Sequence, residues 1–331
     1  MPFRDITGHR QLLEMIARAA VRGTLPPSLI FAGPEGIGKR MAAVALAQFL
    51  NCPNRTSEDS CGTCPSCTRI ARQVHADVLL IEPGETGTIK IDQIRDAIER
   101  TAYRPFEGRR RVVIVDDADA VNVEAQNAML KTLEEPPAAS PFVLVTSRPD
   151  VLLPTVLSRC QRLRFGRLSP GDVAAVLARD HEYSETEAHA AASLSDGSIG
   201  LALDGGSDEF VEAREAATDL LEVVAASPDP RRRLAGAKSL SGAARGGSDR
   251  DELARRLRAL ASILRDLGIL ISRADEGALA NTDLRPRLER LQRSFDGDRA
   301  LRAFAAVDRA LMALDRNASP KIVADWLAFQ I

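Results

Sequence analysis

The chain has 331 residues, of which 45% are hydrophobic, so it can bury a sizeable core and is long enough for two or three domains. Its formal net charge of −2 excludes a global basic field that would drive nucleic-acid binding by the chain alone. The sequence starts without an apolar signal-like stretch and contains no run of about 18 apolar residues, so we expect a soluble, cytoplasmic protein without a membrane segment.

The first elements lead to a glycine-rich loop. Residues 6–21 have the apolar spacing of a helix, with Thr7 as a candidate cap, and the apolar run at 29–32 predicts a strand. GPEGIGKR follows at 33–40, and a second helical pattern covers 41–50. Glycines in this order let backbone N–H groups face phosphate oxygens, and the lysine can reach the β- and γ-phosphates. The candidate nucleotide-binding residues are Gly33, Gly36, Gly38, Lys39 and Arg40.

This loop departs from the phosphate-loop pattern at one position. Arg40 stands where Ser or Thr would supply a hydroxyl ligand to magnesium. An ordinary tight turn is the alternative interpretation, but a strand before the loop and a helix after it favour phosphate binding. The pattern therefore predicts nucleotide binding and does not imply hydrolysis.

Four of the five cysteines follow the second helix with the spacing C-x8-C-x2-C-x2-C. In a cytosolic chain thiols stay reduced, so disulfides are disfavoured, and four thiolates suit a tetrahedral structural zinc. Such a site leaves no open position for water, which argues against metal catalysis. Unrelated buried cysteines are the alternative, and His75 is expected on the surface rather than as a fifth ligand. The candidate metal ligands are Cys52, Cys61, Cys64 and Cys67.

Further strands are predicted at 77–82, 112–115 and 142–146, with helices at 92–103 and 125–135. Asp116 and Asp117 follow the middle strand, where a magnesium-associated aspartate would stand, and Thr146 is expected at the same sheet edge. A helix cap is the alternative for the acidic pair. The arginine run 109–111 is expected on a solvated face, with phosphate contact as the lesser alternative. Alternating strands and helices predict an α/β fold with an open, mainly parallel sheet.

From Ser169 onward every periodic stretch is helical. Three short helices are predicted at 173–178, 185–194 and 198–203, beginning with a Ser169 cap and a proline at the first helical position. The Gly205-Gly206 pair is predicted to be a linker. The longer stretches beyond it predict a helical bundle, and they cover residues 210–226, 230–240, 253–271, 284–295, 300–314 and 321–329.

Three stretches resemble the AAA+ subunits of the bacterial DNA polymerase III clamp loader: the cysteine cluster, LKTLEEPP at 130–137 and LSRCQ at 157–161. The resemblance implies an AAA+ domain over residues 1–166 with a zinc module at 52–67. It implies a helical lid over 167–206 and an all-helical collar over 207–331, through which five subunits form a ring. The implied partners are the other clamp-loader subunits, the sliding clamp and, through the complex, primed DNA.

The resemblance also indicates which kind of subunit this is. Hydrolysing members carry Ser or Thr, Glu and Arg where this sequence has Arg40, Asp117 and Gly200. Asp117 is one methylene short of the glutamate that polarises the attacking water, and Gly200 cannot supply charge to a γ-phosphate. These departures imply the stationary, non-hydrolysing member, with ATP or ADP bound weakly or structurally.

Arg159 of the Ser-Arg-Cys stretch is unaffected by these departures. In the resembling family this arginine projects into a neighbour's nucleotide site, so we expect Arg159 to act in trans. An ATP-hydrolysing subunit is the alternative, disfavoured by residues 40, 117 and 200 and by the end of the sequence at Ile331 without a long extension. A zinc-dependent nucleic-acid-binding protein is a third possibility, disfavoured by the acidic balance and by the lack of aromatic residues around the cysteines.

Overall fold

The chain forms two compact units, Met1–Arg167 and Leu168–Ile331, each with its own core. The computed structural model describes residues 1–84, 86–137, 140–204, 207–226, 229–240, 249–274, 278–316 and 318–331. The predicted Gly205-Gly206 linker lies outside the described residues. None of the described helices is long and apolar enough to cross a membrane.

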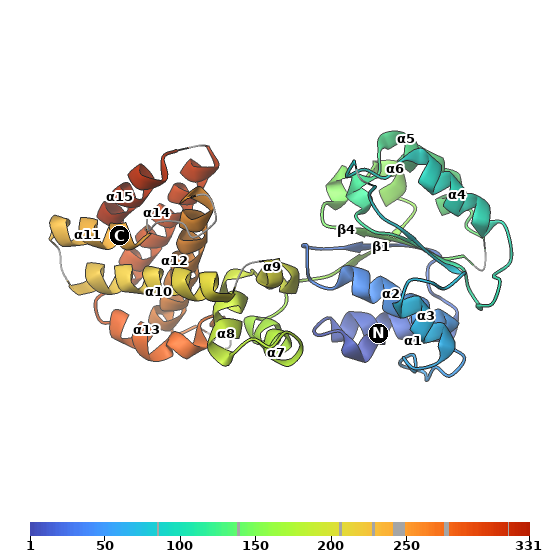
Figure 1. Ribbon diagram of the computed structural model, residues 1–331, viewed down its shortest axis with the longest axis horizontal. Helices are drawn as coiled ribbons and strands as arrows, with labels where there is room; N and C mark the ends of the chain where they lie inside the picture. Colours follow the sequence, from blue (N-terminus) through green and yellow to red (C-terminus); the bar gives the residue numbers. More distant parts are fainter. Residues whose placement is uncertain are drawn as a thin grey trace. The chain divides into compact units, whose positions relative to one another are not determined.

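The first unit is built on a sheet of five parallel strands in the order β2-β3-β4-β1-β5. The neighbouring strands β4 and β1 are labelled in Figure 1. Because all strands run the same way, their carboxyl ends share one edge, where ligands of such sheets bind. The predicted open parallel sheet is therefore confirmed. The strands are β1 (Ser28–Ala32), β2 (Val78–Ile81), β3 (Val112–Val115), β4 (Phe142–Thr146) and β5 (Gln161–Arg164).

Helices cover both faces of this sheet (Figure 1). Leu29 and Phe31 of β1 pack in a core with the first three helices, while Ile30 and Ala32 pack in a second core with the next three. This alternation follows from the two-residue period of a strand and explains why residues 29–32 of β1 are all apolar. The helices are α1 (Arg10–Arg22), α2 (Lys39–Asn51) and α3 (Pro65–Ala71) on one face, and α4 (Ile91–Thr101), α5 (Val123–Glu134) and α6 (Pro154–Leu157) on the other.

In the first unit one local expectation is wrong and one strand was not foreseen. Helix α1 starts at Arg10, and its N-cap is His9 in the left-handed conformation (φ 55°), so Thr7 is not the cap. Strand β5 was not predicted, because only Leu163 of its four residues is buried and its hydrogen-bonded neighbour in the sheet is β1 alone. An edge strand with charged side chains lacks the apolar run that marks a central strand.

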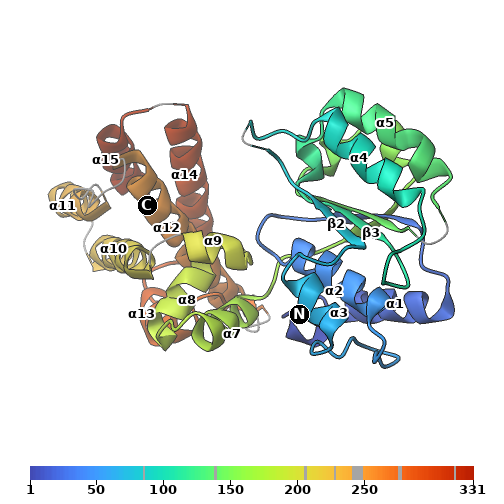
Figure 2. The ribbon, with the colours of Figure 1, turned by 45° about the vertical axis from the view of Figure 1, so that its right-hand side comes forward.

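The second unit is entirely helical in its described part, as predicted. Its first helices share one core and its later helices a larger one, and α12 runs beside α14 (Figure 2). Ser169 caps α7 by accepting the N–H of Asp172, with Pro170 at the first helical position. Its division into lid and collar stays a prediction. The helices are α7 (Pro170–Asp180), α8 (Glu185–Leu194), α9 (Ile199–Asp204), α10 (Ser207–Ala226), α11 (Pro230–Leu240), α12 (Asp249–Ser272), α13 (Arg285–Leu291), α14 (Gly297–Asp315) and α15 (Pro320–Gln330).

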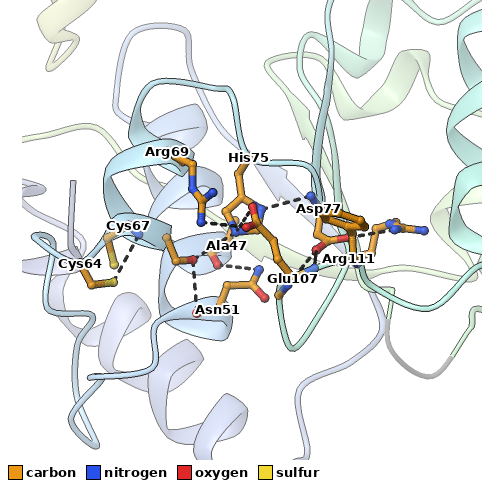
Figure 3. Close-up of polar contacts among 12 residues, drawn as sticks. Ala47, Asn51, Cys64, Cys67, Arg69, His75, Asp77, Glu107 and Arg111 are labelled. Carbon is orange, nitrogen blue, oxygen red and sulfur yellow. Dashed lines mark hydrogen bonds and ion pairs between the residues drawn. The ribbon is translucent and has the colours of Figure 1, made fainter.

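A buried polar network around Asp77 joins β2, β3 and the loop between α4 and β3 (Figure 3). Asp77 is fully buried and accepts hydrogen bonds from Arg111 Nη2 at 2.8 Å and from the backbone N–H groups of residues 106–108 at 2.7–2.8 Å. Burial alone would raise the pKa of Asp77, but these hydrogen bonds outweigh it and lower the pKa to about 2. The network thus fixes a loop that has no secondary structure of its own.

The same network corrects two expectations about exposure. Arg111 is only 8% exposed because its guanidinium pairs with Asp77, so the arginine run does not lie wholly on a solvated face. His75 is only 4% exposed rather than on the surface: its Nδ1 accepts the Asp77 N–H, and its Nε2 lies 3.2 Å from Ser66 Oγ (Figure 3). Both side chains are buried with polar partners, although among the described residues Arg111 Nε makes no hydrogen bond.

Replacing Asp77 by asparagine is expected to lower the free energy of unfolding of the first unit by about 3 kcal/mol at neutral pH, because Arg111 becomes a buried charge without its partner. Since the folded pKa of about 2 lies below an ordinary aspartate value, this stabilisation is present above about pH 4 and is lost as the pH falls through about 2. Urea unfolding at neutral pH and at about pH 3 measures both effects.

The matched control is Asp96→Asn, since Asp96 is 72% exposed and lies 3.9 Å from Arg100. This change should alter the unfolding free energy by less than about 0.5 kcal/mol. Equal urea midpoints for Asp77→Asn and wild type would contradict the role given to Asp77.

Candidate functional site

The glycine-rich loop between β1 and α2 is shaped by its glycines. Gly36 and Gly38 have φ angles of 67° and 92°, a region that disfavours side chains, and Gly38 is the N-cap of α2. A Cβ added at Gly33 would lie 2.3 Å from the carbonyl oxygen of Phe165, so the loop approaches the backbone directly after β5 too closely for a side chain. The Gly33 N–H donates to the Thr146 carbonyl at 3.2 Å, which ties the loop to β4.

Lys39 begins α2 and is only 7% exposed. Its ammonium group donates to the Pro34 carbonyl within the loop. Burial lowers the pKa of Lys39, while the nearby carboxylates of Glu35, Asp116, Asp117 and Asp119 act in the opposite direction. The ammonium group of Lys39 therefore lies among several carboxylates.

Arg40 connects the loop to two strand ends. Its Nη1 lies 3.1 Å from Asp116 Oδ2 at the end of β3 and 2.5 Å from Glu82 Oε1 just after β2. The Asp116 side chain is only 11% exposed, and burial raises its pKa while the Arg40 guanidinium opposes that rise. An arginine thus faces the carboxylate that, in phosphate-loop enzymes, stands by the magnesium ion.

The two remaining predicted residues of this site, Asp117 and Thr146, differ in their exposure and in their hydrogen bonds. Asp117 is exposed and holds a left-handed conformation with φ 46°. The Thr146 hydroxyl donates to Asp119 Oδ1 at 2.8 Å and accepts the Arg148 N–H at 3.1 Å. Arg148 in turn pairs with Asp119 Oδ2 at 2.9 Å. The structure therefore brings Asp116 and Thr146 to the predicted edge, but the Thr146 hydroxyl already has partners.

Sequence reasoning missed three members of this cluster: Glu82, Asp119 and Arg148. Burial raises the pKa of Asp119, but hydrogen bonds from Thr146 and Arg148 outweigh it, so the net pKa is lowered. Glu82 could have been found from its place directly after a predicted strand, since carboxyl ends of parallel strands meet. Asp119 and Arg148 could not be predicted in the same way. Each is separated from the end of its strand by a turn, and the sequence does not show in which direction that turn leads.

Arg159 is held in a different place, by contacts outside the glycine-rich loop. Its Nε and Nη2 donate to Glu134 Oε2 at 3.2 and 3.0 Å, and its Nη1 donates to the Thr155 carbonyl at 3.0 Å. Glu134 is the first glutamate of LKTLEEPP at 130–137, and Arg159 belongs to LSRCQ at 157–161. These two stretches are therefore joined by one ion pair. The Arg159 side chain remains 32% exposed, so its head can be reached from solvent.

The four predicted metal ligands converge. One sulfur atom from each of Cys52, Cys61, Cys64 and Cys67 lies within 4.8 Å of the others. The Sγ of Cys52 is 3.5 Å from that of Cys61 and 3.9 Å from that of Cys64. A tetrahedral zinc with bonds of about 2.3 Å requires sulfur separations of about 3.8 Å, so this donor set fits such an ion.

Backbone N–H groups also point at these sulfurs. The N–H groups of Cys61, Cys64 and Cys67 lie 3.3–3.4 Å from the Sγ atoms of Cys52, Cys61 and Cys64, respectively. Figure 3 shows the contact between Cys67 and Cys64. For Cys61, the N–H groups of Cys64 and Thr63 lower the thiol pKa to about 6, whereas burial raises the pKa of Cys52 and of Cys67. The fifth cysteine, Cys160, is outside the cluster, and burial raises its pKa to about 12.

The cluster is tied to the rest of the first unit at both ends. Asp59 accepts the backbone N–H groups of Phe3 and Arg4, and the Arg4 guanidinium donates to the carbonyl oxygens of Ser60 and Cys61. The Gln48 side chain on α2 donates to the Cys67 carbonyl at 2.7 Å. The segment with the cysteines therefore holds the N-terminal residues against the helix that starts at the glycine-rich loop.

Comparison with known proteins adds family information for the first unit. Residues 8–169 match the family model described as DNA polymerase III, delta subunit. The chain is 33% identical over 177 residues to DNA polymerase III subunit gamma/tau of Mycobacterium tuberculosis, covering 54% of this chain and 31% of that protein. It is 40% identical over 129 residues to DNA polymerase III subunit delta′ of Pseudomonas aeruginosa, covering 39% of each. The chain thus spans about a third of the length of the gamma/tau relatives that it matches.

Solved structures also align along most of the chain. One is a DNA polymerase III gamma subunit-related protein from Thermotoga maritima, with 20% identity, a TM-score of 0.42 and coverage of 96% of this chain and 97% of that one. Another is the Bacillus subtilis DNA clamp loader delta protein, with 12% identity, a TM-score of 0.36 and coverage of 96% and 98%.

Proposed function

We propose that the chain, whose residues 8–169 match the family model described as DNA polymerase III, delta subunit, is a delta-prime-type subunit of the clamp loader. It is a stationary AAA+ subunit that does not hydrolyse ATP, places Arg159 in the nucleotide site of a neighbouring subunit and helps to load the sliding clamp on primed DNA during replication. Its partners are the gamma/tau and delta subunits of a hetero-pentamer, and its compartment is the cytoplasm.

The Arg40–Asp116 ion pair is the observation that carries this proposal. Hydrolysis in phosphate-loop enzymes needs magnesium held by the loop hydroxyl and the strand-end aspartate. Here the hydroxyl is replaced and the aspartate is paired with a guanidinium. Asp117, which stands in place of the glutamate that polarises water, is exposed in a left-handed conformation and has a shorter side chain.

We assign the four-cysteine cluster to a structural Zn²⁺. Its donor set is complete with protein sulfurs, so no coordination position is left for water or substrate. The metal would act as a cross-link between the N-terminal residues and α2, which Asp59 and Gln48 already connect to the cluster segment.

An ATP-hydrolysing gamma/tau-type subunit is the second candidate. The identity to gamma/tau extends over 177 residues, more than the 129 residues matched to delta′, and Lys39 is present in the loop. Turnover of ATP by the purified chain separates the two candidates, because only a gamma/tau-type subunit has a complete site of its own.

We expect the isolated chain to release no phosphate from ATP above the level of a Lys39→Ala variant. The variant is the matched control because it removes the phosphate-binding ammonium from the same loop. Steady-state phosphate release measures this directly. Turnover by the wild-type chain that disappears in Lys39→Ala would overturn the delta-prime assignment in favour of the gamma/tau type.

A further inference from the structure

The residues at the proposed nucleotide site do not fit a magnesium ion. Two groups hold that ion in phosphate-loop sites, the hydroxyl after the loop lysine and the aspartate at the strand end. The first is replaced by Arg40, and the second, Asp116, lies 3.1 Å from the Arg40 guanidinium. A divalent cation bound to Asp116 would lie next to this positive charge, and like charges at such separations repel.

Arg40 supplies a fixed positive charge at the same place. Its Nη1 makes the contacts with both Asp116 and Glu82, which joins the ends of β3 and β2. Among the described residues, its Nε and Nη2 make no hydrogen bond, so the three N–H groups on these two nitrogen atoms remain as donors. A guanidinium binds phosphate oxygens well because its donors form a planar fork.

We propose that this chain binds a nucleoside diphosphate or triphosphate without a divalent cation, with the Arg40 guanidinium taking the charge-neutralising place of magnesium. The inference rests on the nucleotide-binding part of the function proposed above. Lys39 and the N–H groups of the glycine-rich loop bind the phosphates, while Arg40 neutralises Asp116 and Glu82 and thereby lowers the repulsion between these carboxylates and the phosphates. Nucleotide occupancy of this subunit is then independent of the magnesium concentration.

Titration of the full chain with ADP by calorimetry tests this inference, once with magnesium and once in buffer freed of divalent cations by a chelating resin. A soluble chelator is avoided because it would compete for metal at the cysteine cluster. For wild type, the dissociation constant should differ by less than about twofold between the two buffers. For Arg40→Thr, which restores the hydroxyl and frees Asp116, ADP should bind at least about tenfold more tightly with magnesium than without it.

Two further variants make the result specific. Arg22→Thr removes an exposed arginine on α1 and should behave as wild type. Arg40→Ala removes the guanidinium without adding a hydroxyl, so ADP should bind it at least about tenfold more weakly than wild type in the magnesium-free buffer. Thermal unfolding of each variant shows whether it is folded, and the wild-type comparison remains decisive if Arg40→Thr does not fold.

Wild-type binding that tightens tenfold or more with magnesium would overturn the inference, because it would show that the ion binds despite Arg40. Absence of ADP binding by folded wild type in both buffers would also overturn it, together with the nucleotide-binding part of the proposed function. That outcome would leave the role of Arg159 intact, since Arg159 is tested at the neighbour's site. Turnover by the chain alone would instead overturn the proposed function.

Discussion

Arg159→Ala is expected to lower ATP hydrolysis at the neighbouring subunit's site by on the order of 10³-fold when the clamp loader is assembled with the variant. The reason is that an arginine supplied in trans stabilises charge on the transferring phosphoryl group, and alanine leaves that charge without a partner. Steady-state phosphate release by the mixed subunits should then fall to the rate that the remaining sites supply. The isolated chain should unfold at an unchanged temperature.

The geometry of Arg159 permits this role. Its contacts with Glu134 and Thr155 hold the side chain at the surface, where 32% of it is exposed. An exposed ion pair contributes about 0–1 kcal/mol, so the guanidinium can exchange Glu134 for a phosphate at little cost. In the isolated chain Glu134 pairs with the arginine at 3.0 Å, and such a defined position would limit the entropy lost in the proposed contact with a neighbour's nucleotide.

Three control variants separate this role from a structural one. Glu134→Ala breaks the same ion pair from its other side and should leave turnover within about twofold of wild type. Arg159→Lys keeps the charge but not the forked donors, so it should recover little of the loss. Arg18→Ala, on the exposed face of α1, should have no effect. Full turnover in the complex with Arg159→Ala would exclude the proposed role.

Sequence patterns predicted the central strands because a strand buried on both faces is apolar throughout. Both β3 and β4 have the predicted bounds, and all of their residues are buried. The edge strand β5 carries Gln161, Arg162 and Arg164 on exposed positions, so composition did not distinguish it from a loop. The cysteine cluster was predictable because its ligands are close in sequence and a metal site restricts their spacing.

What remained hidden depends on contacts between distant segments. Arg40 was recognised as a departure from the phosphate-loop pattern, but its partner Glu82 lies 42 residues away. Arg111 and Asp77 are 34 residues apart, and each alone resembles an ordinary surface charge. Pairs of this kind form because the strand order β2-β3-β4 brings the ends of β2 and β3 together. That strand order cannot be deduced from the sequence alone.

The second large effect is expected from the cysteine cluster. Purified wild-type protein should contain one zinc per chain, and Cys67→Ser should contain none, because Cys67 is fully buried and its loss leaves an incomplete donor set. We expect the free energy of unfolding of the first unit to fall by about 4 kcal/mol or more, since binding of a structural metal contributes directly to folding. Elemental analysis and urea unfolding measure these two effects.

Removal of the metal should act beyond the cluster itself. Asp59 and the carbonyl groups of Ser60 and Cys61 hold Phe3 and Arg4, so chelation should speed amide hydrogen exchange in residues 3–5. Cys160→Ser is the matched control, because Cys160 is also buried but lies outside the cluster, and this variant should keep one zinc. Wild-type protein without zinc, or chelation that changes neither stability nor exchange, would show that the four thiols do not form a structural metal site.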